Sequence, residues 1–61
     1  MCDNIFVISA RDVDGYYIPV VAGRTERDTR KAWARWKASQ ADNDHWDKTC
    51  EPITAWVVVE G

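Results

Sequence analysis

The stretch RKAWARWK, residues 30–37, decides which fold the sequence predicts. Read as a line, it interleaves two tryptophans with four cationic side chains, a pattern that can mark a surface for stacking bases and binding phosphates. On a helix, with about 100° between residues, the two kinds of side chain separate. The face that holds both tryptophans comprises Thr29, Ala32, Trp33, Trp36 and Gln40. We therefore interpret the stretch as an amphipathic helix whose tryptophans are core residues that point at a sheet, and a base-stacking platform is the alternative.

The helix is expected to run from about Glu26 to about Gln40. Thr25 can cap its free amides, and the acidic side chains of Glu26 and Asp28 suit the positive end of a helix. Asp and Asn residues in the segment 41–47, ADNDHWD, favour turns and should end it.

Three short apolar segments predict strands: NIFVIS at 4–9, YYIPVV at 16–21 and ITAWVVVE at 53–60. Asp14-Gly15 is a hairpin signal that joins the first two, and Gly23 should break the second strand. Pro19 cannot donate to a ladder, which places the second strand at a sheet edge or at a bulge. The expected fold is α+β, a single domain with the order β-β-α-β. Its three-stranded antiparallel sheet has the strand order 2-1-3, with the helix packed on one face.

Both faces of this sheet are apolar, although one helix can cover only one of them. In the segment 53–60, Val57 and its alternate neighbours line one face, and Trp56 and Val58 line the other. The uncovered face and the free edge of this strand, around Trp56 and Val58, are candidate contact surfaces. The alternative is that the loop 41–52, which carries Trp46, folds over the uncovered face.

Charge is segregated along the chain. The net charge is −2 at pH 7, yet six of the eight Lys and Arg residues lie between Arg24 and Lys37. Arg27, Lys31 and Arg35 recur at a spacing of four and should form a stripe opposite the tryptophans. Such a face can steer binding to an acidic partner, protein or nucleic acid. The predicted partner-binding residues are Arg24, Arg27, Arg30, Lys31, Arg35, Lys37, Trp56 and Val58.

The sequence gives no support for catalysis, a metal or a cofactor. His45 is the only histidine, and no Ser-His or Cys-His spacing suggests a nucleophile. A metal site could be imagined from Cys2, His45 and Cys50 with Asp44 or Asp47, but the spacing fits no zinc pattern. We expect no enzyme, no metal and no cofactor, and two reduced thiols rather than a disulfide. Without a membrane span or a signal peptide, the expected location is the cytoplasm.

Some residues resemble those of a known family. Ile18-Pro19-Val20 with Ala22, Thr25 before the helix, Ala32 and a Trp late in the helix are similar to the small phage inhibitor of host RNA polymerase made by T-odd coliphages. That family is also a short β-β-α-β domain. Its helix is acidic, and it grips the polymerase with arginines in its last strand, where Val57, Val58 and Val59 stand here. No binding residue carries over, and the resemblance implies a fold and a mode of action.

The resemblance implies a small inhibitor that binds and blocks a larger bacterial host enzyme, RNA polymerase or another nucleic-acid-processing machine, in the host cytoplasm. A homodimer through the edge of the strand 53–60 is a further expectation. The segment DVDGYY, residues 12–17, also resembles a hairpin of HicB-like antitoxins, although the third strand of that family before the helix is missing. The alternative is therefore a nucleic-acid-binding or antitoxin-like regulator that uses the basic helix face.

Overall fold

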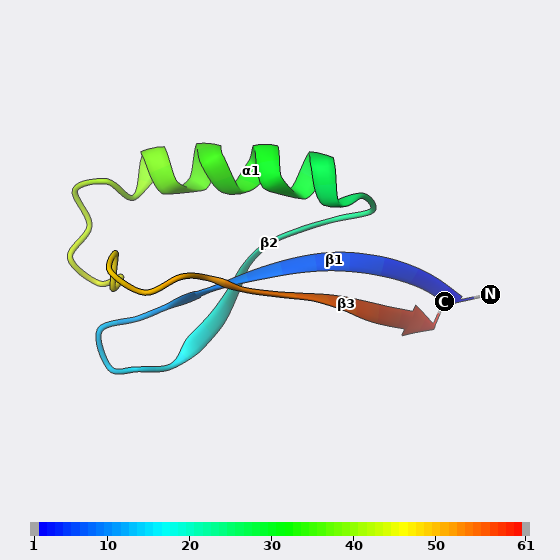
Figure 1. Cartoon of the computed structure of the whole chain (residues 1–61), viewed down its shortest axis with the longest axis horizontal. Helices are drawn as coiled ribbons and strands as arrows, with labels where there is room; N and C mark the ends of the chain where they lie inside the picture. The colour runs from blue at the N-terminus through cyan, green and yellow to red at the C-terminus, as the bar shows by residue number, and fades with distance from the viewer. Residues whose placement is uncertain (1, 61) are drawn as a thin grey trace.

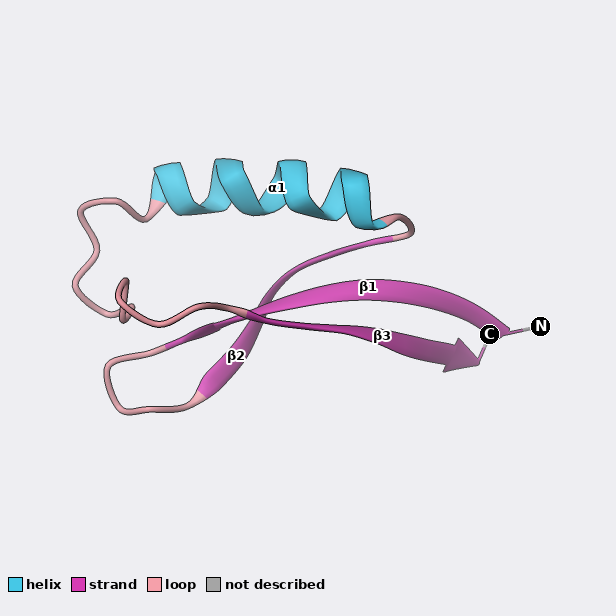
Figure 2. Ribbon diagram, in the orientation of Figure 1, coloured by secondary structure: helices cyan, strands magenta, loops and turns pink. Residues whose placement is uncertain are grey.

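The computed structural model describes residues 2–60 and has the predicted element order β-β-α-β (Figure 1). The elements are β1 (Cys2–Arg11), β2 (Tyr17–Gly23), α1 (Glu26–Ser39) and β3 (Ile53–Glu60). The sheet is antiparallel with the order β2-β1-β3, and α1 lies over one of its faces (Figure 2). The predicted α+β fold and strand order are confirmed.

The β1–β2 hairpin closes on a buried carboxylate. Asp12 Oδ1 accepts hydrogen bonds from the amides of Asp14 and Tyr16, at 3.0 and 2.9 Å. Gly15 has a φ of 94°, in the left-handed region that glycine reaches without steric cost. The Asp-Gly turn predicted from the sequence is therefore present, and Asp12 satisfies two of its amides.

Pro19 lies on the outer strand of the sheet, next to a bulge. Ile8 pairs with Val21, but the next residue of β1, Ser9, pairs with Pro19, so β2 carries one extra residue. This confirms the predicted edge position. The strand does not stop at Val21, as the segment 16–21 suggested, because Gly23 still pairs with Phe6.

The helix begins and faces the sheet as predicted. Thr25 caps it by accepting a hydrogen bond from the Asp28 amide at 3.1 Å. The expected inner face is confirmed, since its members are the only α1 and C-cap positions that are not exposed. They pack over the side of β1 that carries the buried residues Phe6, Ile8 and Ala10.

Burial within that face differs from the expectation that Trp33 and Trp36 form the core. Both rings are only half-buried, whereas Thr29 and Ile8 are the side chains with 0% exposure. Thr29 donates to the Thr25 carbonyl at 2.7 Å and lies 3.5 Å from the Phe6 carbonyl oxygen. The helix thus comes closest to the sheet where its inner side chain is small, and the large rings lie further along, beside the loop 41–52.

Gly23 makes this close approach possible. A Cβ atom at position 23 would lie 2.5 Å from Thr29 Oγ1, so either the Thr29 side chain or one of the two elements must shift. We expect Gly23→Ala to lower the free energy of unfolding by about 1–3 kcal/mol, the usual cost of overpacking. Urea unfolding followed by tryptophan fluorescence measures the loss. Adding Thr29→Ala should recover part of it, whereas Thr29→Ser keeps the oxygen and should recover none; equal effects of the two would contradict the clash.

Candidate binding surfaces

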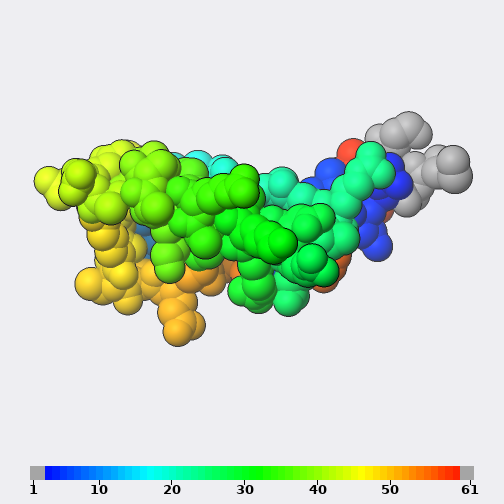
Figure 3. Space-filling view, turned by 90° about the horizontal axis from the view of Figure 1, so that it is seen from above, coloured from blue at the N-terminus to red at the C-terminus, as the bar shows by residue number. Residues whose placement is uncertain are grey.

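The predicted cations lie on α1 and in the turn that precedes it. All six are exposed, and we call Arg24, Arg27, Arg30, Lys31, Arg35 and Lys37 the basic helix surface. The helix runs along the middle of the face seen in Figure 3. Arg24 precedes the first turn of α1, and the other five lie on the helix, away from its inner face.

Two members of this surface make contacts within the domain. Arg30 forms an ion pair with Glu26 at 3.2 Å, and its guanidinium carbon lies 5.8 Å from the centre of the Phe6 ring. Lys37 Nζ lies 5.9 Å from the centre of the Trp33 ring. Within residues 2–60, Arg27, Lys31 and Arg35 form no ion pair, so their charges face solvent.

The second surface is β3. Trp56 is 53% exposed and Val58 is 61% exposed, and the strand also exposes Ile53, Val57 and Val59. Large apolar side chains are thus exposed on both faces of one strand. β3 also ends the sheet, so one of its edges has no neighbouring strand. An apolar strand that is open on two faces and one edge is a typical protein contact surface.

The register decides which side each of these residues occupies. Trp56 pairs with Phe6, and their rings meet edge to face at 5.0 Å, so Trp56 lies on the helix side. It is exposed nevertheless, because α1 packs over β2 and β1. Val57 pairs with Ile5 on the opposite, uncovered face. The candidate surface is therefore the whole of β3, wider than the edge around Trp56 and Val58.

The loop 41–52 does not cover the uncovered face, since Ile53, Val57 and Val59 remain exposed there. It runs instead beside the end of β1, where the Asp47 amide donates to the Arg11 carbonyl at 2.9 Å. Trp46 packs edge to face on Trp36, with ring centres 4.9 Å apart. This alternative is excluded, and the uncovered face stays open.

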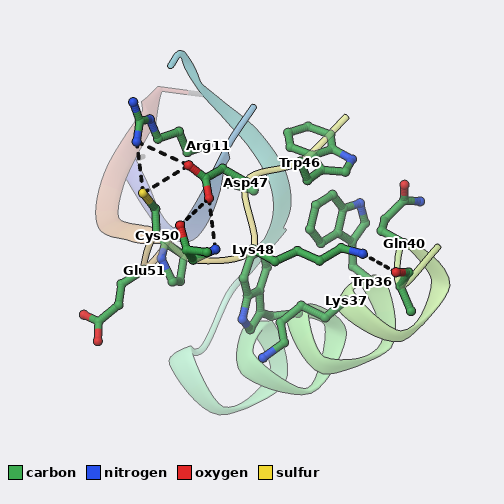
Figure 4. A pocket seen from close by; sticks show the side chains of 14 residues that line it. Arg11, Trp36, Lys37, Gln40, Trp46, Asp47, Lys48, Cys50 and Glu51 are labelled. Atoms are coloured by element: carbon green, nitrogen blue, oxygen red, sulfur yellow. Dashed lines mark hydrogen bonds and ion pairs between the residues drawn. The ribbon is translucent and has the colours of Figure 1, made fainter. Parts of the chain in front are cut away.

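A cavity of about 480 Å³ lies between the last turns of α1 and this loop (Figure 4). Trp33 and Trp36 stack with ring centres 5.1 Å apart, and Trp36 also meets Trp46. Lys48 reaches across the loop and donates to the Ala41 carbonyl. The three indoles hold the loop against the helix, which explains how half-buried rings can be structural.

A polar cluster closes the other side of the cavity. Arg11 donates to Cys50 Sγ at 3.0 Å and to Asp47 Oδ2 at 3.4 Å, as Figure 4 shows. The side chain and amide of Thr49 both donate to Asp47 Oδ1, at 2.6 and 2.9 Å. Chiefly through Thr49, these contacts lower the pKa of Asp47, and the Cys50 contact raises the pKa of Arg11. The cluster ties the loop to the end of β1.

The two cysteines lie at opposite ends of β1. Cys2 pairs with Glu60 at one end, and Cys50 contacts Arg11 at the other. Arg11 lies nine residues after Cys2, which is about 30 Å of extended strand, and a disulfide needs Cα atoms within about 7 Å. The fold therefore excludes a bond between Cys2 and Cys50 within one chain, and Cys50 is a free thiol. The Cys2 side chain lies outside the described part.

We expect a variant with Cys2→Ser and Cys50→Ser to keep its circular dichroism spectrum, because a serine hydroxyl can still accept from Arg11. Melting temperature and zinc content are the measurements. Loss of structure when a chelator is added to the native protein would contradict this expectation.

Among the residues described, no group of three or more His, Cys, Asp or Glu side chains could hold a metal ion. Within residues 2–60, no helix has the length and apolar character needed to cross a membrane. Comparisons with protein-family models, with curated proteins and with solved structures give no match to this chain.

Sequence reasoning missed the contacts of the loop. Asp47 and Cys50 lie 36 and 39 residues after Arg11 in the sequence, so no local spacing indicates that the three side chains meet. The one available signal was Trp46, a large apolar residue within a polar segment, which had to pack somewhere.

Proposed function

We propose that this protein is a small protein-binding inhibitor that docks on an acidic surface of a larger bacterial enzyme. RNA polymerase, or another nucleic-acid-processing enzyme of the bacterial cytoplasm, is the first target to test, on the resemblance to phage inhibitors. The observation that carries the proposal is the basic helix surface, above all Arg27, Lys31 and Arg35.

The charge layout supports binding to an acidic partner. On a chain of net charge −2, α1 carries five cations and two acids, and the other eight acidic residues lie outside it. Such a distribution orients the protein during encounter and raises association rates with an acidic surface. Since Arg27, Lys31 and Arg35 have no ion pairs within residues 2–60, binding would not first have to break one.

Two observations favour a protein over a nucleic acid. The rings in RKAWARWK stack on each other, and Trp36 also meets Trp46 edge to face, instead of standing free for bases. The exposed apolar strand β3 is typical of protein contacts. The basic helix surface keeps direct nucleic-acid binding, or an antitoxin-like regulatory role, as the second candidate function.

The test is a transcription assay with purified bacterial RNA polymerase, together with capture of bound proteins from bacterial lysate. The expected result is inhibition that saturates with added protein and weakens as salt rises. If transcription is unaffected and no nucleic-acid enzyme is captured, the proposed target is wrong.

Titration with duplex and single-stranded DNA and with RNA at two salt concentrations separates the second candidate. Contacts with several phosphates would give a steep fall of affinity with salt. Under the proposed function we expect no such binding at physiological salt, and tight binding would favour the second candidate.

A further inference from the structure

We infer that two copies of this chain pair through the free edge of β3, so that their sheets join into one. The inference concerns β3 and a second copy, and it does not depend on the proposed function of the basic helix surface. Its first support is a contrast between the two edges of the sheet.

One edge of the sheet is protected and the other is open. β2 carries Pro19 and a bulge, two features that prevent further strand pairing. Residues 53–59 of β3, ITAWVVV, contain no proline, glycine or charged residue, and the β1–β3 pairing shows no register shift. Natural edge strands that stay unpaired usually carry such protection. Of the two edge strands, only β3 lacks this protection, which indicates that another chain covers the β3 edge in the functional protein.

The hydrogen bonds of β1 show which β3 amides are free. The Asp12 amide, just past β1, donates toward the β2 side, to the Tyr16 carbonyl, whereas the Arg11 carbonyl and the Val13 amide bond the loop on the other side. Odd-numbered residues of β1 therefore direct their backbone groups to the β3 side. These groups alternate along a strand, and Ile5 and Val7 pair with Val57 and Ala55. The amides and carbonyls of the even-numbered β3 residues therefore point away from β1. They belong to Thr54, Trp56 and Val58.

A second copy fits this edge by symmetry. Two identical edge strands pair antiparallel about a two-fold axis, and directly opposed side chains lie on the same face of the joined sheet. Trp56 then stands opposite Thr54, Trp56 or Val58 of the second copy. In each of these registers, Ile53–Val59 brings no two charges together. The edge is thus self-complementary in hydrogen bonding, in apolar character and in charge.

The helices do not oppose this arrangement. Each α1 packs over β2 and β1, so both β3 strands lie between the two helices. Three strand spacings of about 4.8 Å separate the two β1 strands by about 14 Å. That distance exceeds the Debye length of about 8 Å at physiological salt, so the two basic helix surfaces repel each other little.

The size of the contact predicts a modest affinity. The eight residues of β3 extend over about 26 Å. One strand edge buries less than the roughly 800 Å² per partner of a standard interface. We therefore expect a dimer that forms and dissociates in the micromolar concentration range.

Amide hydrogen exchange, read residue by residue by NMR at low and high protein concentration, tests the pairing. The Trp56 and Val58 amides should exchange at least tenfold more slowly at high concentration. The Ala55 and Val57 amides, which face β1, should be protected at both. Sedimentation should show a change from one copy to two over the same range.

Val58→Pro removes one outward amide and should abolish the dimer, whereas the matched variant Val58→Thr keeps the amide and should retain most of it. Circular dichroism checks that both fold. If Val58→Pro does not fold, the concentration dependence of amide exchange in the native protein still tests whether the β3 edges pair. A single-copy mass at all concentrations, fast exchange of Trp56 and Val58 throughout, or growth beyond two copies would overturn the inference.

Discussion

Trp36→Ala should leave little folded protein at physiological temperature. The Trp36 ring stacks on Trp33 and meets Trp46 edge to face, so its loss releases both the end of α1 and the loop 41–52. Buried Trp→Ala changes lower the free energy of unfolding by about 3–5 kcal/mol. Because this ring is only half-buried, we expect a loss of about 3 kcal/mol. A domain of this size has only a few kcal/mol of stability, so that loss is a large share of it. Thermal melting by circular dichroism measures the effect.

Trp56→Ala is the matched control, because that ring is 53% exposed. Measured at concentrations too low for pairing between copies, it should cost about 1 kcal/mol, mainly through the lost contact with Phe6. Equal melting temperatures for Trp36→Ala and the native protein would mean that the three-indole cluster contributes nothing to the fold.

Reversing the charges of Arg27, Lys31 and Arg35 to glutamate should leave the fold intact and weaken binding to an acidic partner by at least about tenfold. The three side chains are exposed and spaced by four, so the variant replaces one set of like charges by another. Glutamate at position 27 also suits the positive end of the helix. Most of the loss should appear in the association rate and its salt dependence if the charges lie at the rim of the interface, and in dissociation if they are buried there.

The altered net charge by itself could weaken binding, because the three substitutions together lower the net charge by 6, from −2 to −8. Arg35→Glu and Lys48→Glu provide the matched pair, since each gives −4 but only the first alters the basic helix surface. We expect weaker binding for Arg35→Glu alone. A folded triple variant with native affinity for its target would remove the helix from the interface and leave β3 as the docking surface.

Much of the fold was predictable because its signals are local. Thr25, the Asp14-Gly15 turn and Pro19 each act through the backbone within a few residues, and the helix face follows from a 3.6-residue period. The basic helix surface was predictable for the same reason, because the 3.6-residue period determines which side of the helix each residue occupies, whatever the helix packs against.

The remainder depends on contacts between segments distant in the sequence. The full burial of Thr29 requires Gly23 beneath it, and neither residue indicates the other along the chain. The exposure of Trp56 on the helix side required both the register with Phe6 and the lateral position of α1. A hydrophobic pattern predicts which face of the sheet a side chain occupies, but it does not predict which strands of that face the helix covers.

The bulge beside Pro19 has a consequence for the size of any assembly. A sheet with two open edges can add strands at both ends and grow without limit into fibres. Here β2 offers no place for another strand, so growth ends once the β3 edge is occupied. Because only one edge of the sheet is open, the protein could keep an unprotected edge strand, β3, for pairing without forming fibres.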